Sequence, residues 1–207
     1  MTPTSATPAA GKKLMTADEF WEFVHRPENE PRFFVLIRGE VQEVPRPTKI
    51  HGIVQIRIGR SIEEWAEKVG RGYVAAESGV VLRENPDTVA GPDVAYYTDA
   101  DTFDEVPPKW GEVAPVLAVE ILSPNDKMTR VNARISEYLS SGSRVVWLVD
   151  YEERKVTVYR PDKSHTVIGE DGELTGGDAL PGLTIRLADL FRLPGQKPSP
   201  PQQPQAT

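Results

Sequence analysis

The sequence predicts an α/β fold in which a mixed β-sheet is flanked by helices. The main observation lies in residues 116–150, where two continuous apolar runs enclose an amphipathic segment. This strand–helix–strand order predicts a right-handed crossover between parallel strands that are buried on both faces. A second amphipathic segment at residues 50–69 predicts another helix, and hairpin patterns elsewhere add antiparallel strands.

The folded part is expected to begin with a helix and a hairpin. The residues from Thr16 to Glu19 resemble a capping box, which predicts a helix that runs to about Val24. Residues 33–44 (FFVLIRGEVQEV) read as two short strands around Arg38-Gly39.

A long helix and several short strands should follow. Apolar residues at near-helical spacing predict an amphipathic helix over residues 50–69. These residues are Ile53, Ile56, Ile62, Trp65 and Val69. Short strands are expected over residues 73–77, 80–82 and 93–97, and the polar, proline-containing residues 98–113 predict a loop.

The crossover unit is the most informative part of the chain. Residues 116–122 (VLAVEIL) and 145–150 (VVWLVD) predict two buried strands. Residues 127–141 predict the helix between them, which Gly142 is placed to end. The apolar stripe of this helix consists of Val131, Ile135, Tyr138 and Leu139. A terminal hairpin is expected over 156–160 and 166–168.

Composition limits the number of domains and the class of protein. The 207 residues suit one domain, and 39% hydrophobic residues suffice for a core. Residues 1–13 are rich in Thr, Pro, Ala and Ser, and residues 194–207 in Pro and Gln. These compositions predict disordered tails on either side of a folded body at residues 14–193.

Cysteine content, apolar runs and charge exclude several functions. The absence of cysteine excludes disulfides and zinc–thiolate sites and fits the cytoplasm. No apolar run reaches the roughly 20 residues of a membrane helix, and the N-terminus lacks the apolar stretch of a secretory signal. The net charge of −7 argues against a protein that coats nucleic acid without specificity. It is compatible with a nuclease, whose metal site is itself acidic.

Two acidic residues stand out by their surroundings. Glu120 lies inside the apolar run 116–122, where an ionised carboxylate is costly unless it is paired or binds a metal. A salt bridge to a nearby arginine is the alternative explanation. Asp93 follows Gly91-Pro92, which alone indicates only a turn. On neighbouring buried strands, the two carboxylates would suit a hard cation such as Mg²⁺.

The order Pro92-Asp93 followed by Glu120 in an apolar strand resembles the PD-(D/E)XK nuclease superfamily. The chain is similar to the Uma2 family, whose members are described as restriction endonucleases. The shared motifs are MTADEF (15–20), VLIRGEV (35–41), His51-Gly52, GPDVAY (91–96), VEILSPND (119–126), EYL (137–139), VVWLVD (145–150), VTVYRPD (156–162) and LPGLTIRLADLF (180–191). The resemblance covers most of residues 15–192. It implies a restriction-endonuclease-like mixed sheet flanked by helices, with Asp93 and Glu120 as catalytic metal ligands.

One position departs from the superfamily pattern. The usual third residue is a lysine two positions after the glutamate, where this chain has Leu122. In Uma2-like chains the lysine lies on the following helix, four residues before the tyrosine, at the position of Arg134. Arginine can hold a phosphate or stabilise developing charge, but it cannot replace a lysine that gives up a proton.

Helical spacing gives Arg134 two neighbours of the same charge. Lys127, Arg130 and Arg134 share one side of the 127–141 helix, near the C-terminal end of the Glu120 strand. Lys127 and Arg130 are therefore candidate substrate-binding residues, and Lys127 is a second candidate for the missing lysine. The alternative is a surface helix in which Arg134 pairs with Glu137 at i,i+3.

Two further residues, Glu40 and His51, each have two possible roles, and a third, Glu77, has none assigned. By the resemblance, Glu40 belongs to the acidic catalytic site; the alternative is a solvated hairpin charge. His51 either begins a helix or contacts substrate. Glu77 is an acidic residue near a strand end to which the sequence assigns no role.

Together these features predict a metal-dependent endonuclease that hydrolyses phosphodiester bonds in DNA. Asp93 and Glu120 would hold Mg²⁺ or Mn²⁺, Glu40 would bind metal or orient water, and Arg134 would stabilise charge on the phosphate. One alternative is a catalytically degenerate nuclease fold that binds nucleic acid or a protein partner. Another is a structural module whose carboxylates serve only the fold. DNA is the expected partner, and a homodimer would provide two sites for two strands.

Overall fold

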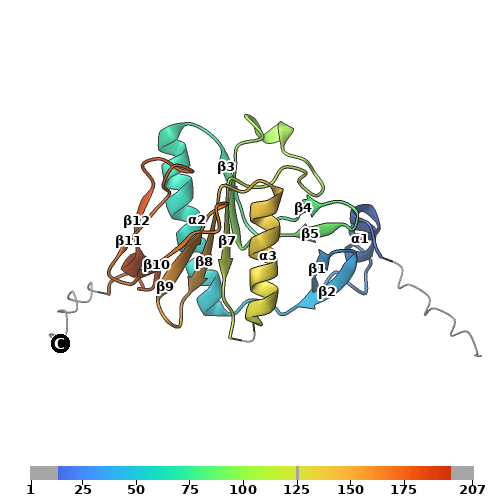
Figure 1. Ribbon diagram of the computed structural model, residues 1–207, viewed down its shortest axis with the longest axis horizontal. Helices are drawn as coiled ribbons and strands as arrows, with labels where there is room; N and C mark the ends of the chain where they lie inside the picture. Colours follow the sequence, from blue (N-terminus) through green and yellow to red (C-terminus); the bar gives the residue numbers. More distant parts are fainter. Residues whose placement is uncertain (1–13, 125, 197–207) are drawn as a thin grey trace, which may run out of the picture.

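The computed structural model describes residues 14–124 and 126–196, which form two larger β-sheets, a two-stranded sheet and the helices packed around them (Figure 1). The tails predicted at residues 1–13 and 194–207 lie outside the described residues, apart from 194–196. Within the described part, no helix combines the length and the apolar character needed to cross a membrane.

The six-stranded sheet is built around the predicted crossover. β7 (Leu117–Ile121) and β8 (Val145–Asp150) run parallel, and α3 (Met128–Ser141) connects them. The other strands pair antiparallel, so this sheet is mixed, as predicted. The strand order is β10 (His165–Gly169), β9 (Lys155–Tyr159), β8, β7, β6 (Val94–Tyr97) and β3 (Tyr73–Ala75).

A four-stranded sheet lies beside α3 (Figure 1). The predicted hairpin forms its edge, because β1 (Phe33–Ile37) and β2 (Glu40–Val44) pair antiparallel around the turn at residues 38–39. β5 (Thr88–Ala90) and β4 (Val80–Arg83) complete the order β2-β1-β5-β4. The sequence does not predict β5, because three residues between turn segments are too few to show a periodicity.

The two shorter predicted helices begin and end close to the expected positions. α1 (Ala17–Val24) starts at the capping box of Thr16 and Glu19. α3 ends at Gly142, which has a left-handed φ of 118° that costs glycine little.

The long helix α2 (Lys49–Val69) is also confirmed, but its buried face differs from the predicted stripe. The side chains that face the sheet are His51, Val54, Ile58, Ile62 and Ala66. Ile53 and Val69 are exposed, as is Ile56 at 73%. The segment carries more apolar residues than one face can hold. The four-residue repeat from Val54 to Ala66 fixes which of them are buried.

The two faces of the six-stranded sheet carry separate cores. From β7, Leu117, Val119 and Ile121 pack in the cluster that includes α2, whereas Ala118 packs in the cluster that includes α3. Successive side chains of a strand point to opposite faces, so Glu120 shares the α3 face with Ala118. The fold thus directs this buried carboxylate toward α3.

The chain continues beyond the predicted terminal hairpin, which β9 and β10 form. β11 (Glu173–Thr175) and β12 (Thr184–Arg186) pair antiparallel, and α4 (Leu187–Leu190) follows. Leu174, Leu180 and Leu187 from this segment are buried in the core on the α2 side. The predicted loop at 98–113 contains one short 3₁₀ helix, η1 (Phe103–Glu105).

Candidate functional site

A cavity of about 160 Å³ lies where β6 begins and β7 ends. One wall is apolar and comes from the β1–β2 hairpin and the residues after it, from Phe33 to Pro47. The opposite wall is polar, and its ionisable residues are His51, Glu77, Asp93, Glu120, Asp126 and Arg134. The cavity therefore combines several acidic groups with one arginine beside an apolar surface.

Strand pairing brings Asp93 and Glu120 into this cavity. β6 pairs antiparallel with β7, with Val94 opposite Val119. Asp93 immediately precedes β6 and so lies opposite Glu120, the next residue along β7. Asp93 Oδ2 accepts a hydrogen bond of 2.5 Å from the Ile121 backbone N–H, which fixes the carboxylate against the end of β7.

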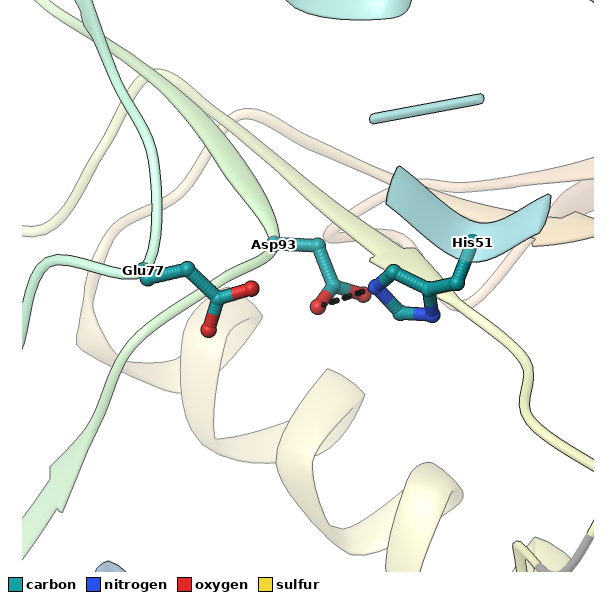
Figure 2. Close-up of side chains that lie close together, drawn as sticks. All are labelled: His51, Glu77 and Asp93. Carbon is teal, nitrogen blue, oxygen red and sulfur yellow. Dashed lines mark hydrogen bonds and ion pairs between the residues drawn. The ribbon is translucent and has the colours of Figure 1, made fainter. Parts of the chain in front are cut away.

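Asp93 also belongs to a cluster with His51 and Glu77 (Figure 2). One ligand atom from each residue lies within 4.8 Å of the other two. His51 Nε2 lies 3.0 Å from Asp93 Oδ1, and Figure 2 shows Asp93 between Glu77 and His51. These are the atom types and separations that can hold a metal ion.

Helix α2 and the turn after β3 position this cluster. His51 lies in the first turn of α2, where the Thr48 hydroxyl accepts a hydrogen bond from its backbone N–H. Glu77 occupies a turn with a left-handed φ of 55°. Gln55, one helical turn after His51, donates to Glu77 Oε1 at 2.9 Å and to the Asp93 carbonyl at 2.8 Å. His51 and Gln55, on one face of α2, thereby connect this helix to the turn that carries Glu77 and to Asp93 just before β6.

The electrostatics of the cluster favour a bound cation. Burial raises the pKa of Glu77, and the negative charge of Asp93 raises it further. Burial lowers the pKa of His51, but its hydrogen bond to Asp93 and the nearby carboxylates outweigh burial, so that its pKa is raised overall. For both residues the neighbouring carboxylates contribute to the raised pKa, and a cation bound here would counter their charge.

Glu120 takes part in a second, buried arrangement with α3. Its Oε2 accepts hydrogen bonds from Arg134 Nε at 2.9 Å and Nη2 at 2.6 Å, and its Oε1 accepts one from the Tyr138 hydroxyl at 2.8 Å. Burial raises the pKa of Glu120, while the Arg134 charge opposes the rise. Burial also raises the pKa of the Tyr138 hydroxyl, and the Glu120 charge adds to this effect.

These contacts bear on the alternatives that the sequence left open for Glu120 and Arg134. Glu120 does pair with an arginine, which was the alternative to a metal role. The alternative pair of Arg134 with Glu137 is wrong, because Glu137 instead binds Arg38 and Arg83. The role of Glu120 as a metal ligand stays a prediction.

The predicted basic side of α3 borders the cavity. A groove of about 290 Å³ is lined by Lys127 and Arg130, and it shares Arg134, Asp126 and part of the hairpin with the cavity. Lys127 and Arg130 are exposed at its surface. Positive charge therefore continues from Arg134 along the start of α3.

The structure does not bring Glu40 to the cavity. Glu40 is paired with Ile37 at the turn end of the hairpin, whereas the cavity is lined by Phe33 and Val44 at the open end. Conversely, the structure adds Glu77, for which the sequence has no local signal. Its position depends on a turn that only the packing of α2 against β3 and β6 places.

His51 satisfies both of its interpretations, since it lies in the first turn of α2 and also lines the cavity. Whether it contacts substrate stays a prediction. Its Nδ1 is buried and has no hydrogen-bond partner within residues 14–124 and 126–196, while its Nε2 faces Asp93.

Comparison with known proteins gives consistent results. The family model of Uma2, described as "Putative restriction endonuclease", matches residues 20–188. Among solved structures, a "putative nuclease belonging to DUF820" from Anabaena variabilis is similar, with a TM-score of 0.73 and 25% sequence identity over 86% of this chain and 97% of that chain. No curated protein matches. The structural similarity confirms the predicted nuclease-like α/β fold.

Proposed function

Because the chain belongs to the Uma2 family, we propose that it hydrolyses phosphodiester bonds in DNA with a divalent metal ion, Mg²⁺ or Mn²⁺, bound beside Asp93. The observation that carries this proposal is that the cluster of His51, Glu77 and Asp93 opens into the same cavity as Arg134. A cation site and a fixed cationic side chain are the two elements that phosphoryl chemistry requires.

The residues present fit a divalent ion. Two carboxylates and an imidazole converge. Neighbouring carboxylates contribute to the raised pKa values of Glu77 and His51, and a bound cation would counter their charge. Asp93 belongs both to the predicted pair and to the observed cluster. Glu120 would join the ligands only if its bonds to Arg134 or Tyr138 rearranged.

Each side chain then has a distinct task. His51, Glu77 and Asp93 would hold a divalent ion, which would supply Lewis acidity to a phosphate oxygen and lower the pKa of water. Arg134 stabilises the negative charge that develops on the phosphate, and it stays protonated at any accessible pH. Glu120 holds this part of α3 in a single orientation, because Arg134 and Tyr138 both donate hydrogen bonds to its carboxylate.

The groove beside α3 supports nucleic acid as the substrate class. Lys127 and Arg130 line it, next to the cavity that contains Asp93. Lysine and arginine side chains in such positions bind the phosphates that flank the reacting one. This local positive charge is compatible with the net charge of −7, since phosphate contacts act at short range in salt.

One observation favours a second candidate, a degenerate nuclease that binds nucleic acid without cutting it. Arg134 is held in a salt bridge with Glu120, and no lysine is among the described residues that line the cavity. Without the lysine, proton transfer at the site would fall to water or to another lining residue such as His51.

The test combines metal titration with nicking of supercoiled plasmid for wild type and Asp93→Asn. Asp162→Asn is the matched control, because Asp162 lies outside the cavity in the loop between β9 and β10. We expect metal binding and nicking in wild type and in the control, and loss of both in Asp93→Asn. Metal binding without nicking would favour the degenerate nuclease. No metal binding by wild type would refute the metal site.

A further inference from the structure

We infer that His51 makes the metal site selective for a first-row transition cation, represented by Mn²⁺, over Mg²⁺. The inference rests on the proposed function, because it concerns the ion bound at the same cluster. It goes beyond that function by assigning metal preference to one residue.

His51 is placed to act as a ligand. Its Nε2 faces the cluster, 3.0 Å from Asp93 Oδ1, and only 4% of the residue is exposed. The first turn of α2 holds its backbone through Thr48. Its other ring nitrogen is buried and has no hydrogen-bond partner among the described residues, so no competing hydrogen bond there turns the ring away from the cluster.

An imidazole ligand discriminates between the two ions. Mg²⁺ takes oxygen ligands in near-ideal octahedral geometry and gives up its waters reluctantly. Imidazole nitrogen is a ligand of first-row transition ions, and Mn²⁺ is the member of that series that also favours oxygen ligands, so it can use both the nitrogen and the oxygens of such a cluster. With one nitrogen beside the carboxylates of Glu77 and Asp93, the cluster therefore suits Mn²⁺ better than Mg²⁺.

The cavity offers no easy replacement for the imidazole by a carboxylate. Both oxygens of Glu120 accept hydrogen bonds from α3 side chains. Asp126 Oδ2 accepts a hydrogen bond of 2.9 Å from the Ser123 backbone N–H. A third carboxylate could join the cluster only if one of these side chains moved, so the imidazole stays the third protein ligand beside Glu77 and Asp93.

The position of His51 in α2 also makes a clean test possible. The first turn of α2 contains no acidic residue, although acidic side chains are favourable at a helix N-terminus. His51→Asp replaces the nitrogen ligand by oxygen at a position where the helix tolerates an acid. His165→Asp is the matched control, because it makes the same change at an exposed histidine in β10.

The experiment measures Mn²⁺ and Mg²⁺ affinity by calorimetry for the full chain and both variants. The ratio of the Mg²⁺ to the Mn²⁺ dissociation constant should fall at least about tenfold in His51→Asp, or about 1.4 kcal/mol. It should stay unchanged in His165→Asp. Circular dichroism verifies that each variant is folded.

A second measurement needs no variant. Pulsed electron paramagnetic resonance of Mn²⁺ bound to wild type should show coupling to a histidine nitrogen. An unchanged affinity ratio in folded His51→Asp, or the absence of nitrogen coupling in wild type, would overturn the inference. Even then, loss of binding of both ions in Asp93→Asn would still support a metal site beside Asp93. Failure of wild type to bind either ion would overturn both.

Discussion

Removing the arginine of the buried salt bridge should destabilise the protein strongly and in a pH-dependent way. The perturbation is Arg134→Ala, which leaves Glu120 in place without its cationic partner. The Glu120 side chain is 6% exposed, and that of Arg134 is 18% exposed. Water therefore reaches the arginine end of the pair more easily than the carboxylate end.

The structure sets the size of this effect. Breaking a buried pair by removing one partner costs about 3–5 kcal/mol. Tyr138 still donates to Glu120 Oε1, which places the expected loss near the lower end, about 3 kcal/mol. The double variant Glu120→Gln, Arg134→Ala should be more stable than Arg134→Ala, because it leaves no buried charge unpaired.

The sign of the pH dependence follows from Glu120. Burial already raises its pKa while Arg134 opposes the rise, so the variant should raise the pKa further. Between the pKa values of the unfolded and the folded state, the folded protein then binds more protons than the unfolded chain. The stability of Arg134→Ala should therefore decrease as pH rises through this window, so that its deficit relative to wild type is larger at about pH 8 than at about pH 5.

Urea denaturation with a chelator present, followed by circular dichroism, measures these stabilities. Wild type, both single variants and the double variant form a complete cycle. A loss below about 1 kcal/mol in Arg134→Ala, the same at both pH values, would show that the pair behaves like a solvated surface contact. The reasoning from burial would then be wrong.

Three further predictions concern neighbouring residues. Tyr138→Phe should lower the free energy of unfolding by about 1–3 kcal/mol, because it removes the donor to buried Glu120 Oε1; urea denaturation measures it, and no loss would mean that water replaces the hydroxyl. Lys127→Ala should weaken DNA binding and reduce the slope of log affinity against log salt by about 1, as expected for one lost phosphate contact; an unchanged slope in a fluorescence anisotropy titration would remove Lys127 from the interface. Arg134→Lys should retain metal binding and at least wild-type plasmid nicking, since lysine keeps the charge and can also give up a proton; lower nicking at equal metal affinity would show that the guanidinium geometry is required.

The crossover was predictable because its signal is local. Two apolar runs, an amphipathic helix and Gly142 specify α3 and its two strands without reference to the rest of the chain. Elements of three or four residues show little periodicity, and only those within a clear apolar run, such as β6 in residues 93–97, were singled out. β5 and the segment from β11 to α4 were not predicted. Their pairing depends on tertiary contacts instead.

The contrast between local sequence signals and tertiary contacts also applies to the residues of the site. Asp93 and Glu120 could be singled out because a carboxylate in or beside an apolar strand conflicts with its surroundings. Glu77 follows a short strand and shows no such conflict, and its turn becomes meaningful only once α2 places Gln55 against it. For Glu40 the resemblance gave a role, but hairpin register places it at the end away from the cavity.

The sequence separation of the contacts in the cavity has a consequence for folding order. Glu120 and Arg134 are 14 residues apart, so the crossover alone can close their loop. His51 and Asp93 are 42 residues apart, and their contact requires a larger loss of chain entropy before any packing offsets it. The salt bridge can therefore form in a partly folded chain, whereas the cluster of His51, Glu77 and Asp93 must await the packing of α2 against β3 and β6. Cation affinity would accordingly report completed folding more stringently than helix content does.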